Sequence, residues 1–255
     1  MIWLIPIAGK GSRTQQLGEF KPFIEVSGHK IITWLLFSTK RNVKTEDKFI
    51  FTTTDYFSEK FQVKKELEKV FDINGLDNEF KVVSTDKELL GNSASVYLAK
   101  PYLTTDEPVS VLCCDQFTDF QLPSEIQPQT CYLSIGIDFG SSKGYVEIED
   151  GLIKKFVEKE PISNFAGGGI YIVSSGKALI FALESQFRDK AISVNGEYCL
   201  GPAFNYLVKD GFKIYPLLAK AHYSLGSILA INCFNSSPII NSLSKVLSPG
   251  GRHVA

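Results

Sequence analysis

The chain has 255 residues, the upper end for one domain, and 44% of them are hydrophobic, which is ordinary for a soluble protein with a sizeable core. Its 27 lysines and arginines nearly cancel its 28 aspartates and glutamates, so no long-range field would attract nucleic acid or an anionic membrane. The opening apolar stretch is far shorter than the roughly 20 residues that span a bilayer, and it lacks a basic leader. We therefore expect a cytoplasmic protein that binds neither nucleic acid nor membrane.

Apolar runs of strand length recur through the first half of the chain and are separated by stretches with helical spacing. The predicted strands cover residues 2–7, 48–53, 80–84, 109–114 and 131–137. Helices are predicted over residues 29–40 and 57–71, where apolar side chains recur on one face. This alternation is typical of a mostly parallel sheet with helices on its faces.

After about residue 138 the pattern changes to short segments that alternate between apolar and polar side chains. Residues 145–149 and 153–157 are joined by Asp150-Gly151, a pair that favours a tight hairpin turn. Further on, the predicted elements are helices over residues 175–187 and 197–209 and a strand over residues 212–217.

We therefore predict an α/β protein with a Rossmann-like, mostly parallel mixed sheet flanked by helices. The absence of a long linker or an internal repeat favours one domain over residues 1–255. Within it, residues 1–138 form a first half, residues 139–245 form a second half, and residues 246–255 form a disordered tail.

A loop broken by glycines follows the first predicted strand, with the sequence Ala8-Gly9-Lys10-Gly11-Ser12-Arg13. The glycines let the backbone approach a ligand closely, so that N–H groups can point at phosphate oxygens. Arg13 adds a planar fork of donors, and Lys21, eight residues later, adds a compact ammonium. The loop is not a Walker loop, and Thr14 stands where the dinucleotide fingerprint needs a third glycine. These features predict a polyphosphate site.

Asp115 follows the apolar run 109–114 and so falls at the same edge of the predicted sheet as the glycine loop. One aspartate facing a triphosphate is enough for Mg²⁺, which prefers oxygen ligands and keeps several waters. The alternative is an aspartate that caps a turn. The stretch Gly91–Ala99 looks like a loop that enters a helix, with Asn92 or Ser93 as its N-cap.

The glycine loop with Arg13, the following Lys21-Pro22 and the glycine turn before the next helix resemble the signature of the sugar-phosphate nucleotidyltransferases, which have a GT-A-like fold. The resemblance implies an enzyme that joins a nucleoside triphosphate to a phosphorylated small molecule and releases pyrophosphate. It implies that Arg13 and Lys21 are catalytic and that Asp115 binds Mg²⁺. It also implies that the nucleotide is bound by Ala8, Gly9, Lys10, Gly11 and Ser12.

Other segments extend the resemblance. Asn92 and Ser95 match the Asn-x-x-Ser form of the family's base-recognition segment in cytidylyltransferases, which favours CTP. Glu158-Lys159, the glycines around Gly168, and Glu197 resemble segments that bind the acceptor. From the residues alone, Lys159 is equally well explained as a solvated lysine, and Glu197 as a charge in the first turn of a helix.

The chain departs from the family at Ser224, where a second metal-binding aspartate is usual. Either Asp115, the triphosphate and water hold the ion, or another residue substitutes, or the protein binds nucleotide without turnover. The chain looks most like a capsule-pathway subgroup that includes enzymes coupling CTP to phosphoglutamine, and a hexose 1-phosphate is the alternative acceptor. Rival classes are a catalytically inactive nucleotide-binding regulatory protein and a nicotinamide oxidoreductase, although residues 28–34 lack the acidic ribose ligand of the latter.

Overall fold

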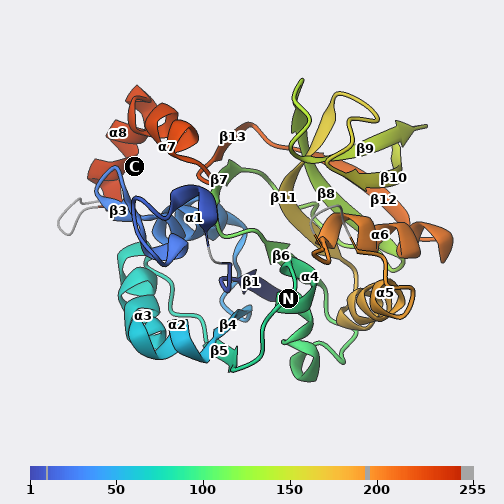
Figure 1. The fold of residues 1–255 in the computed structure, drawn as a ribbon, viewed down its shortest axis with the longest axis horizontal. Coiled ribbons are helices and arrows are strands. Elements are labelled where there is room, and N and C mark those ends of the chain that lie inside the picture. Colours follow the sequence, from blue (N-terminus) through green and yellow to red (C-terminus); the bar gives the residue numbers. More distant parts are fainter. Residues whose placement is uncertain (10, 193–195, 248–255) are drawn as a thin grey trace.

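The computed structural model of the protein describes residues 1–9, 11–192 and 196–247 (Figure 1). These residues form an α/β structure with one nine-stranded sheet flanked by helices and two small two-stranded sheets. This is the fold class that the alternating apolar runs predict. Within the described ranges, no helix is long and apolar enough to cross a membrane.

Four parallel strands form one half of the large sheet. In spatial order they are β5 (Phe80–Thr85), β4 (Lys48–Thr54), β1 (Ile2–Pro6) and β6 (Val109–Leu112). Trp3, Leu4 and Ile5 of β1 are completely buried, as expected for a strand in a sheet that is covered on both faces. Because parallel strands end at the same edge, the glycine loop after β1 and Asp115 after β6 begin close together.

The other half of the sheet is built around β11 (Phe165–Val173), which runs antiparallel to β6, β8 (Thr130–Ile137) and β9 (Gly144–Glu149). The sheet is completed by β10 (Leu152–Glu158), antiparallel to β9, and by β12 (Lys213–Leu218), parallel to β8. Asp150 and Gly151 both have positive φ at the hairpin between β9 and β10, as predicted. The sequence did not predict β11, because three consecutive glycines interrupt its apolar pattern.

Helices cover both faces of the sheet (Figure 1). One face packs against α1 (Ile31–Thr39), α2 (Asp55–Lys60) and α3 (Val63–Asn74). The opposite face packs against α4 (Asn92–Tyr97), α5 (Gly176–Arg188) and α6 (Leu200–Lys209). A third apolar cluster joins α1 to α7 (Ile228–Asn235) and α8 (Pro238–Leu247).

Short elements connect these layers. The small sheets are β2 (Glu25–Val26) with β3 (His29–Lys30), and β7 (Gln116–Asp119) with β13 (Ala221–Ser224). Single 3₁₀ turns are η1 (Ser12–Thr14), η2 (Lys21–Phe23), η3 (Lys40–Asn42) and η4 (Lys100–Tyr102). The pairing of β7 with β13 brings a late segment of the chain beside Asp115, and the candidate site depends on this pairing.

Three predictions of local structure are wrong. The helix predicted over residues 57–71 breaks at Gln62, whose φ is 47°, because a break lets Phe57 and Val63 both enter the core. The N-cap of α4 is Gly91 with a φ of 92°, and neither Asn92 nor Ser93 caps the helix. The predicted tail starts too early, since α8 continues to Leu247; residues 248–255 lie outside the described part of the chain.

The packing of α6 on β10 leads to a prediction about stability. A methyl group at Gly201 of α6 would lie 2.1 Å from the Phe156 ring of β10, which is buried. We expect Gly201→Ala to lower the free energy of unfolding by about 1–3 kcal/mol, because overpacking outweighs the better helix propensity of alanine. Gly136→Ala is the matched control, since a methyl group there meets nothing within 4 Å. Urea denaturation measures both variants, and equal stabilities would contradict the prediction.

Candidate active site

Lys21 and Asp115 form an ion pair at the edge where β1 and β6 end. Lys21 is the first residue of η2, and Asp115 lies in the loop between β6 and β7. The Lys21 Nζ donates a hydrogen bond of 2.8 Å to Asp115 Oδ2. The two side chains are 15% and 23% exposed, so the pair is largely removed from water. A partly desolvated ion pair of this kind is held in place before any ligand binds.

Arg13 reaches the same point, beside Gly226. A methyl group at Gly226 would lie 2.7 Å from Asp115 Oδ2 and 3.5 Å from Arg13 Nη2, so only glycine fits between these groups. The backbone N–H of Leu225 donates to the Asp115 carbonyl at 2.7 Å and fixes the segment there. Arg13, Lys21 and Asp115 therefore converge, although their positions in the sequence are far apart.

The charges in this cluster stabilise one another. Burial by itself would raise the pKa of Asp115, but Lys21 and then Arg13 outweigh it and lower that pKa. Burial opposes the charged form of Lys21, yet the neighbouring carboxylate raises the pKa of Lys21 above its usual value. Both side chains are therefore charged at neutral pH. With Arg13 beside them, the cluster carries one positive charge in excess, which suits an anionic ligand.

The glycine loop packs against Lys21. Gly11 has a φ of 59°, and a methyl group there would lie 3.0 Å from Lys21 Cβ. Gly9 has open space where a side chain would stand, so the backbone there is accessible to a ligand. Lys10 and the side chain of Ser12 lie outside the described part of the structure. Ala8, Gly9 and Gly11 thus lie where the sequence predicts a phosphate-binding loop.

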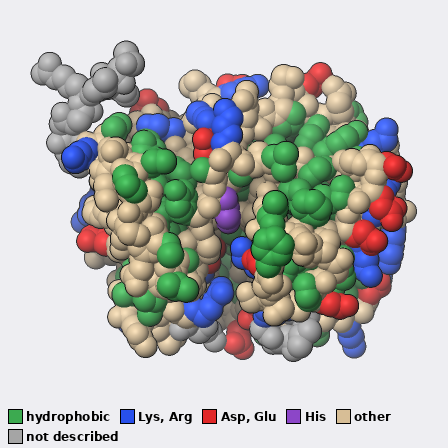
Figure 2. Space-filling model, turned by 90° about the horizontal axis from the view of Figure 1, so that it is seen from above, with side chains coloured by type: hydrophobic (Ala, Val, Ile, Leu, Met, Phe, Trp, Pro, Cys, Tyr) green, Lys and Arg blue, Asp and Glu red, His purple; other side chains and the backbone are tan. Residues whose placement is uncertain are grey.

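The molecular surface is hollowed on the face that is seen when the molecule of Figure 1 is viewed from above. Figure 2 shows the hollow near the centre of that face, with a histidine and charged side chains inside it. The Nδ1 of His222, on β13, shares a hydrogen bond of 2.9 Å with the hydroxyl oxygen of Thr118. Burial and then Lys143 lower the pKa of His222, while Asp115 opposes the shift, so the imidazole is neutral at pH 7. The sequence analysis assigned no role to His222.

Asn92 and Ser95, the residues predicted to recognise the base, already make structural hydrogen bonds. The Asn92 Oδ1 accepts from the backbone N–H of Leu200 at 2.8 Å, and the Ser95 hydroxyl donates to the Gly91 carbonyl at 3.2 Å. Tyr198 exchanges further backbone bonds with Leu90 and Ser93 on the same segment. The side-chain oxygen of Asn92 therefore ties α4 to the start of α6, a role that the sequence did not indicate.

The residues predicted to bind the acceptor come from three segments. Glu158 ends β10, and its pKa is raised chiefly by burial, with Lys159 opposing and Glu197 adding to the shift. Lys159 has a φ of 58°, and its N–H donates to the Lys143 carbonyl at 2.7 Å. The structure brings Glu158 and Glu197 within electrostatic range of each other. It does not single out Gly168 as a ligand contact, because a methyl group there would clash with Ser134 Oγ at 2.7 Å, which is a packing reason for glycine.

The two halves of the site are joined through β11. Gln116 is buried, and its Nε2 donates to the Gly169 carbonyl at 2.9 Å, while the N–H of Cys113 donates to the same oxygen at 2.8 Å. The half-buried Cys113 lies within electrostatic range of both Asp115 and Glu158. The nucleotide and acceptor predictions therefore fall on adjoining surfaces.

Ser224 stands beside Asp115 at the end of β13. It pairs with Gln116 in the β7–β13 ladder, and its hydroxyl accepts from the N–H of Gly226 at 3.3 Å. Among the described residues, no group of three histidine, cysteine, aspartate or glutamate side chains could hold a metal ion. Asp115 with phosphate oxygens and water still fits Mg²⁺, which needs only one or two carboxylates.

Comparisons with known proteins give the fold. No protein-family model and no curated protein matches this chain. Among solved structures, the nucleoside-diphosphate-sugar pyrophosphorylase from Vibrio cholerae RC9 has a TM-score of 0.75 and 21% identity, covering 93% of this chain and 100% of that one. The inositol-1-phosphate CTP transferase from T. maritima has a TM-score of 0.69 and 17% identity, covering 98% and 96% of the two chains.

A UDP-glucose pyrophosphorylase complexed with UDP-glucose has a TM-score of 0.67 and 18% identity, covering 91% of this chain and 97% of its own. All three similarities extend over nearly the whole of both chains. The protein therefore has the fold of these nucleotide-sugar pyrophosphorylases and CTP transferase, as the sequence predicts.

Proposed function

We propose that the protein is a nucleotidyltransferase. A phosphate oxygen of the acceptor attacks the α-phosphorus of a nucleoside triphosphate and forms a new P–O bond. The bond between the α-phosphorus and its bridging oxygen breaks, and pyrophosphate leaves with the electron pair. The observation that carries the proposal is the convergence of Arg13, Lys21 and Asp115 beside the glycine loop. The shared fold supports it, because the names of the similar structures describe pyrophosphorylases and a CTP transferase.

In this proposal the protein acts by positioning and by electrostatic stabilisation, without a covalent intermediate. Arg13 neutralises charge on the departing pyrophosphate, and Lys21 bridges the α-phosphate and the incoming phosphate. Amides of residues 8–12 hold the remaining phosphate oxygens. Asp115 orients the Lys21 ammonium at 2.8 Å and would also hold Mg²⁺. When bound, Mg²⁺ supplies further neutralisation of phosphate charge.

We propose CTP as the nucleotide and phosphoglutamine, in capsule polysaccharide synthesis, as the acceptor. The sequence resemblance of the Asn92–Ser95 segment to cytidylyltransferases supports CTP, as does the CTP transferase among the similar structures, although the Asn92 oxygen and the Ser95 hydroxyl make hydrogen bonds within the protein. The acceptor would be bound by Glu158, Lys159 and Glu197. A hexose 1-phosphate remains the alternative acceptor, because two of the similar structures are named for nucleotide sugars. A single domain and a cytoplasmic location are parts of the same proposal.

Pyrophosphate release tests the reaction and its substrates together. The purified protein is incubated with Mg²⁺, each of the common nucleoside triphosphates, and either phosphoglutamine or a hexose 1-phosphate. We expect release only when a triphosphate and a phosphorylated acceptor are both present, and fastest release with CTP and phosphoglutamine. Fastest release with a hexose 1-phosphate would replace the acceptor and keep the reaction.

A nucleotide-binding regulatory protein is the second candidate function, and Ser224 favours it, since this serine stands where the family that the sequence resembles usually has a second metal-binding aspartate. Such a protein would bind a nucleoside triphosphate in a calorimetric titration and release no pyrophosphate with any acceptor. That pair of results would overturn the transferase proposal.

A further inference from the structure

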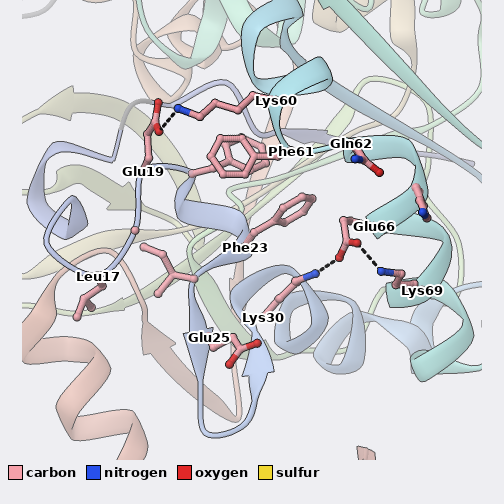
Figure 3. Close-up of a pocket in the computed structure, with 14 residues that line it drawn as sticks. Leu17, Glu19, Phe23, Glu25, Lys30, Lys60, Phe61, Gln62, Glu66 and Lys69 are labelled. Atoms are coloured by element: carbon pink, nitrogen blue, oxygen red, sulfur yellow. Dashed lines mark hydrogen bonds and ion pairs between the residues drawn. The ribbon is translucent and has the colours of Figure 1, made fainter.

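Two parts of the molecular surface differ in whether their polar side chains are already paired. A depression of about 780 Å³ lies between the β2–β3 sheet and the junction of α2 with α3 (Figure 3). Three of its lysines are paired with glutamates, as Lys30 and Lys69 are with Glu66. His222, beside the candidate active site, is different. Among the described residues, only the Nδ1 of its imidazole has a hydrogen-bond partner, so its Nε2 is open to a ligand.

A buried glutamine begins the chain of hydrogen bonds that holds His222. Gln116, on β7, is 3% exposed, and its amide nitrogen lies 2.9 Å from the Gly169 carbonyl oxygen. A carbonyl oxygen only accepts hydrogen bonds, so the amide presents its nitrogen there and its oxygen on the other side. A methyl group at Gly169 would lie 2.7 Å from the amide oxygen, so a glycine is needed beside it. Because Gln116 is buried, its oxygen needs a donor from within the protein.

The hydroxyl group of Thr118, two residues along the same strand, is that donor. Thr118 Oγ1 lies 3.4 Å from Gln116 Oε1, and no other donor within the described ranges is at hydrogen-bond distance from this oxygen. The Thr118 side chain is 1% exposed. A hydroxyl has one proton, so when it donates to Gln116 it can only accept from its other neighbour. That neighbour is the Nδ1 of His222, at 2.9 Å.

This chain of hydrogen bonds decides which nitrogen of His222 carries the proton. Burial and then Lys143 lower the pKa of His222, with Asp115 opposing, so the imidazole is neutral and has a single N–H group. Because Nδ1 donates to Thr118, the proton is on Nδ1 and Nε2 keeps its lone pair. Thr118 and His222 stand directly opposite each other in the β7–β13 ladder, which holds the ring in place. His222 therefore presents a hydrogen-bond acceptor in a fixed position.

The imidazole lies between the two sides of the candidate active site. It is within electrostatic range of Asp115, beside the glycine loop, and of Lys143. The carbonyl of Lys143 accepts a hydrogen bond of 2.7 Å from the N–H of Lys159, the residue proposed to hold the acceptor. The side chain of His222 reaches solvent, so a ligand can contact it. A ligand that spans from Asp115 to Lys159 would therefore pass beside His222.

We propose that the Nε2 of His222 accepts a hydrogen bond from a hydroxyl or N–H group that the acceptor carries next to its phosphate. This role rests on the proposed nucleotidyltransferase function and adds a requirement for the acceptor. Phosphoglutamine offers the N–H of its phosphoramidate, and a hexose 1-phosphate offers its 2-hydroxyl group. Phosphocholine offers neither and would leave Nε2 without a partner, which weakens binding. Gln116 and Thr118 are positioning residues, because they act on the acceptor only through His222.

Nitrogen NMR of the full chain with ¹⁵N-labelled histidine tests this role without turnover. The resonances of His222 are identified by their loss in His222→Asn. We expect a protonated Nδ1 and an unprotonated Nε2 in the free protein. We expect the Nε2 signal to shift when phosphoglutamine or glucose 1-phosphate is added and to stay unchanged with phosphocholine. The compound that shifts it further tells an N–H donor from a hydroxyl donor.

Three results of this experiment would overturn the role of His222. They are a proton on Nε2 in the free protein, an Nε2 signal that neither phosphoglutamine nor glucose 1-phosphate shifts, and an equal shift with phosphocholine. A selective shift of the Nε2 signal in a protein that releases no pyrophosphate would keep this role and overturn the proposed function instead.

Matched variants test the same contact in the reaction. Asparagine places its polar atoms near the position of Nδ1, whereas glutamine can reach the position of Nε2. We expect His222→Asn to raise the KM for the acceptor about 3–10-fold, the effect of losing one hydrogen bond, and to leave the KM for the triphosphate unchanged. His222→Gln should raise the acceptor KM less. Equal acceptor KM values in His222→Asn and the wild type would contradict the role.

Thr118 provides the test of positioning. Thr118→Val keeps the shape of the side chain but removes the hydroxyl, so we expect the Nε2–H form of His222 to appear in the nitrogen spectrum and the acceptor KM to rise. Thr118→Ser keeps the hydroxyl and is the matched control, with the spectrum and KM of the wild type. Circular dichroism checks that both variants fold. An unchanged nitrogen spectrum in folded Thr118→Val would contradict the positioning role.

Discussion

Replacing Lys21 by alanine is expected to lower the rate of pyrophosphate release by about 10²–10³-fold, the usual effect of removing one preorganised donor from a developing charge. Lys21 is held by Asp115 at 2.8 Å and points into the cluster that also contains Arg13. No other described lysine forms an ion pair with Asp115. Arg13→Ala is expected to cause a loss of the same order, because the charge of the leaving pyrophosphate would be left without its guanidinium.

The Lys21 variant should remain folded but become less stable. Without the Lys21 ammonium, the partly desolvated Asp115 carboxylate has only Arg13 as a nearby cation. We expect this to lower the free energy of unfolding by about 1–3 kcal/mol. Lys100→Ala is the matched control, because Lys100 also pairs with a carboxylate, Glu184 at 2.7 Å, but on the surface. The control should keep the wild-type rate. Near-normal rates in both Lys21→Ala and Arg13→Ala, measured with saturating substrates, would refute the roles proposed for them.

Asp115→Asn is expected to be more damaging than Lys21→Ala or Arg13→Ala. We expect turnover to fall by about 10³-fold or more, and added Mg²⁺ should not restore it. The amide has nearly the same shape as the carboxylate, but it removes the charge that orients Lys21 and that would hold the ion. Asp119→Asn is the matched control, since Asp119 lies at the other end of β7 and pairs with Arg41. An Asp115→Asn enzyme with near wild-type turnover would contradict the role of this residue.

The loss of stability caused by Asp115→Asn should depend on pH. Because the pKa of Asp115 is lowered in the folded protein, its ion pair stabilises the fold above the ordinary aspartate pKa of about 3.9, and this stabilisation is lost as pH falls through the lowered value. The stability difference between wild type and Asp115→Asn should therefore be constant from about pH 5 to 8 and shrink under acid conditions. Urea denaturation at several pH values measures this difference.

Much of the fold could be predicted because its signals are local. The buried strands β1, β4 and β6 need apolar residues on both faces, and a continuous apolar run in the sequence indicates this directly. Asp150-Gly151 specified its hairpin because both residues tolerate positive φ. The break at Gln62 was missed, since the apolar positions on either side of it looked like one continuous helical face.

The sequence by itself determined where the glycine loop, the cations that follow it and the carboxylate after β6 lie in the fold. Each of them follows a strand that is recognisable from its own apolar residues. Only the tertiary structure decided that Gly226 lies against Asp115 and that Asn92 binds the backbone of Leu200. These contacts join segments more than 100 residues apart, and their geometry depends on how β13 pairs with β7 and how α6 packs on the sheet. Local patterns carry no record of such pairings, so Gly226, Gln116 and His222 became visible as parts of the site only in the folded chain.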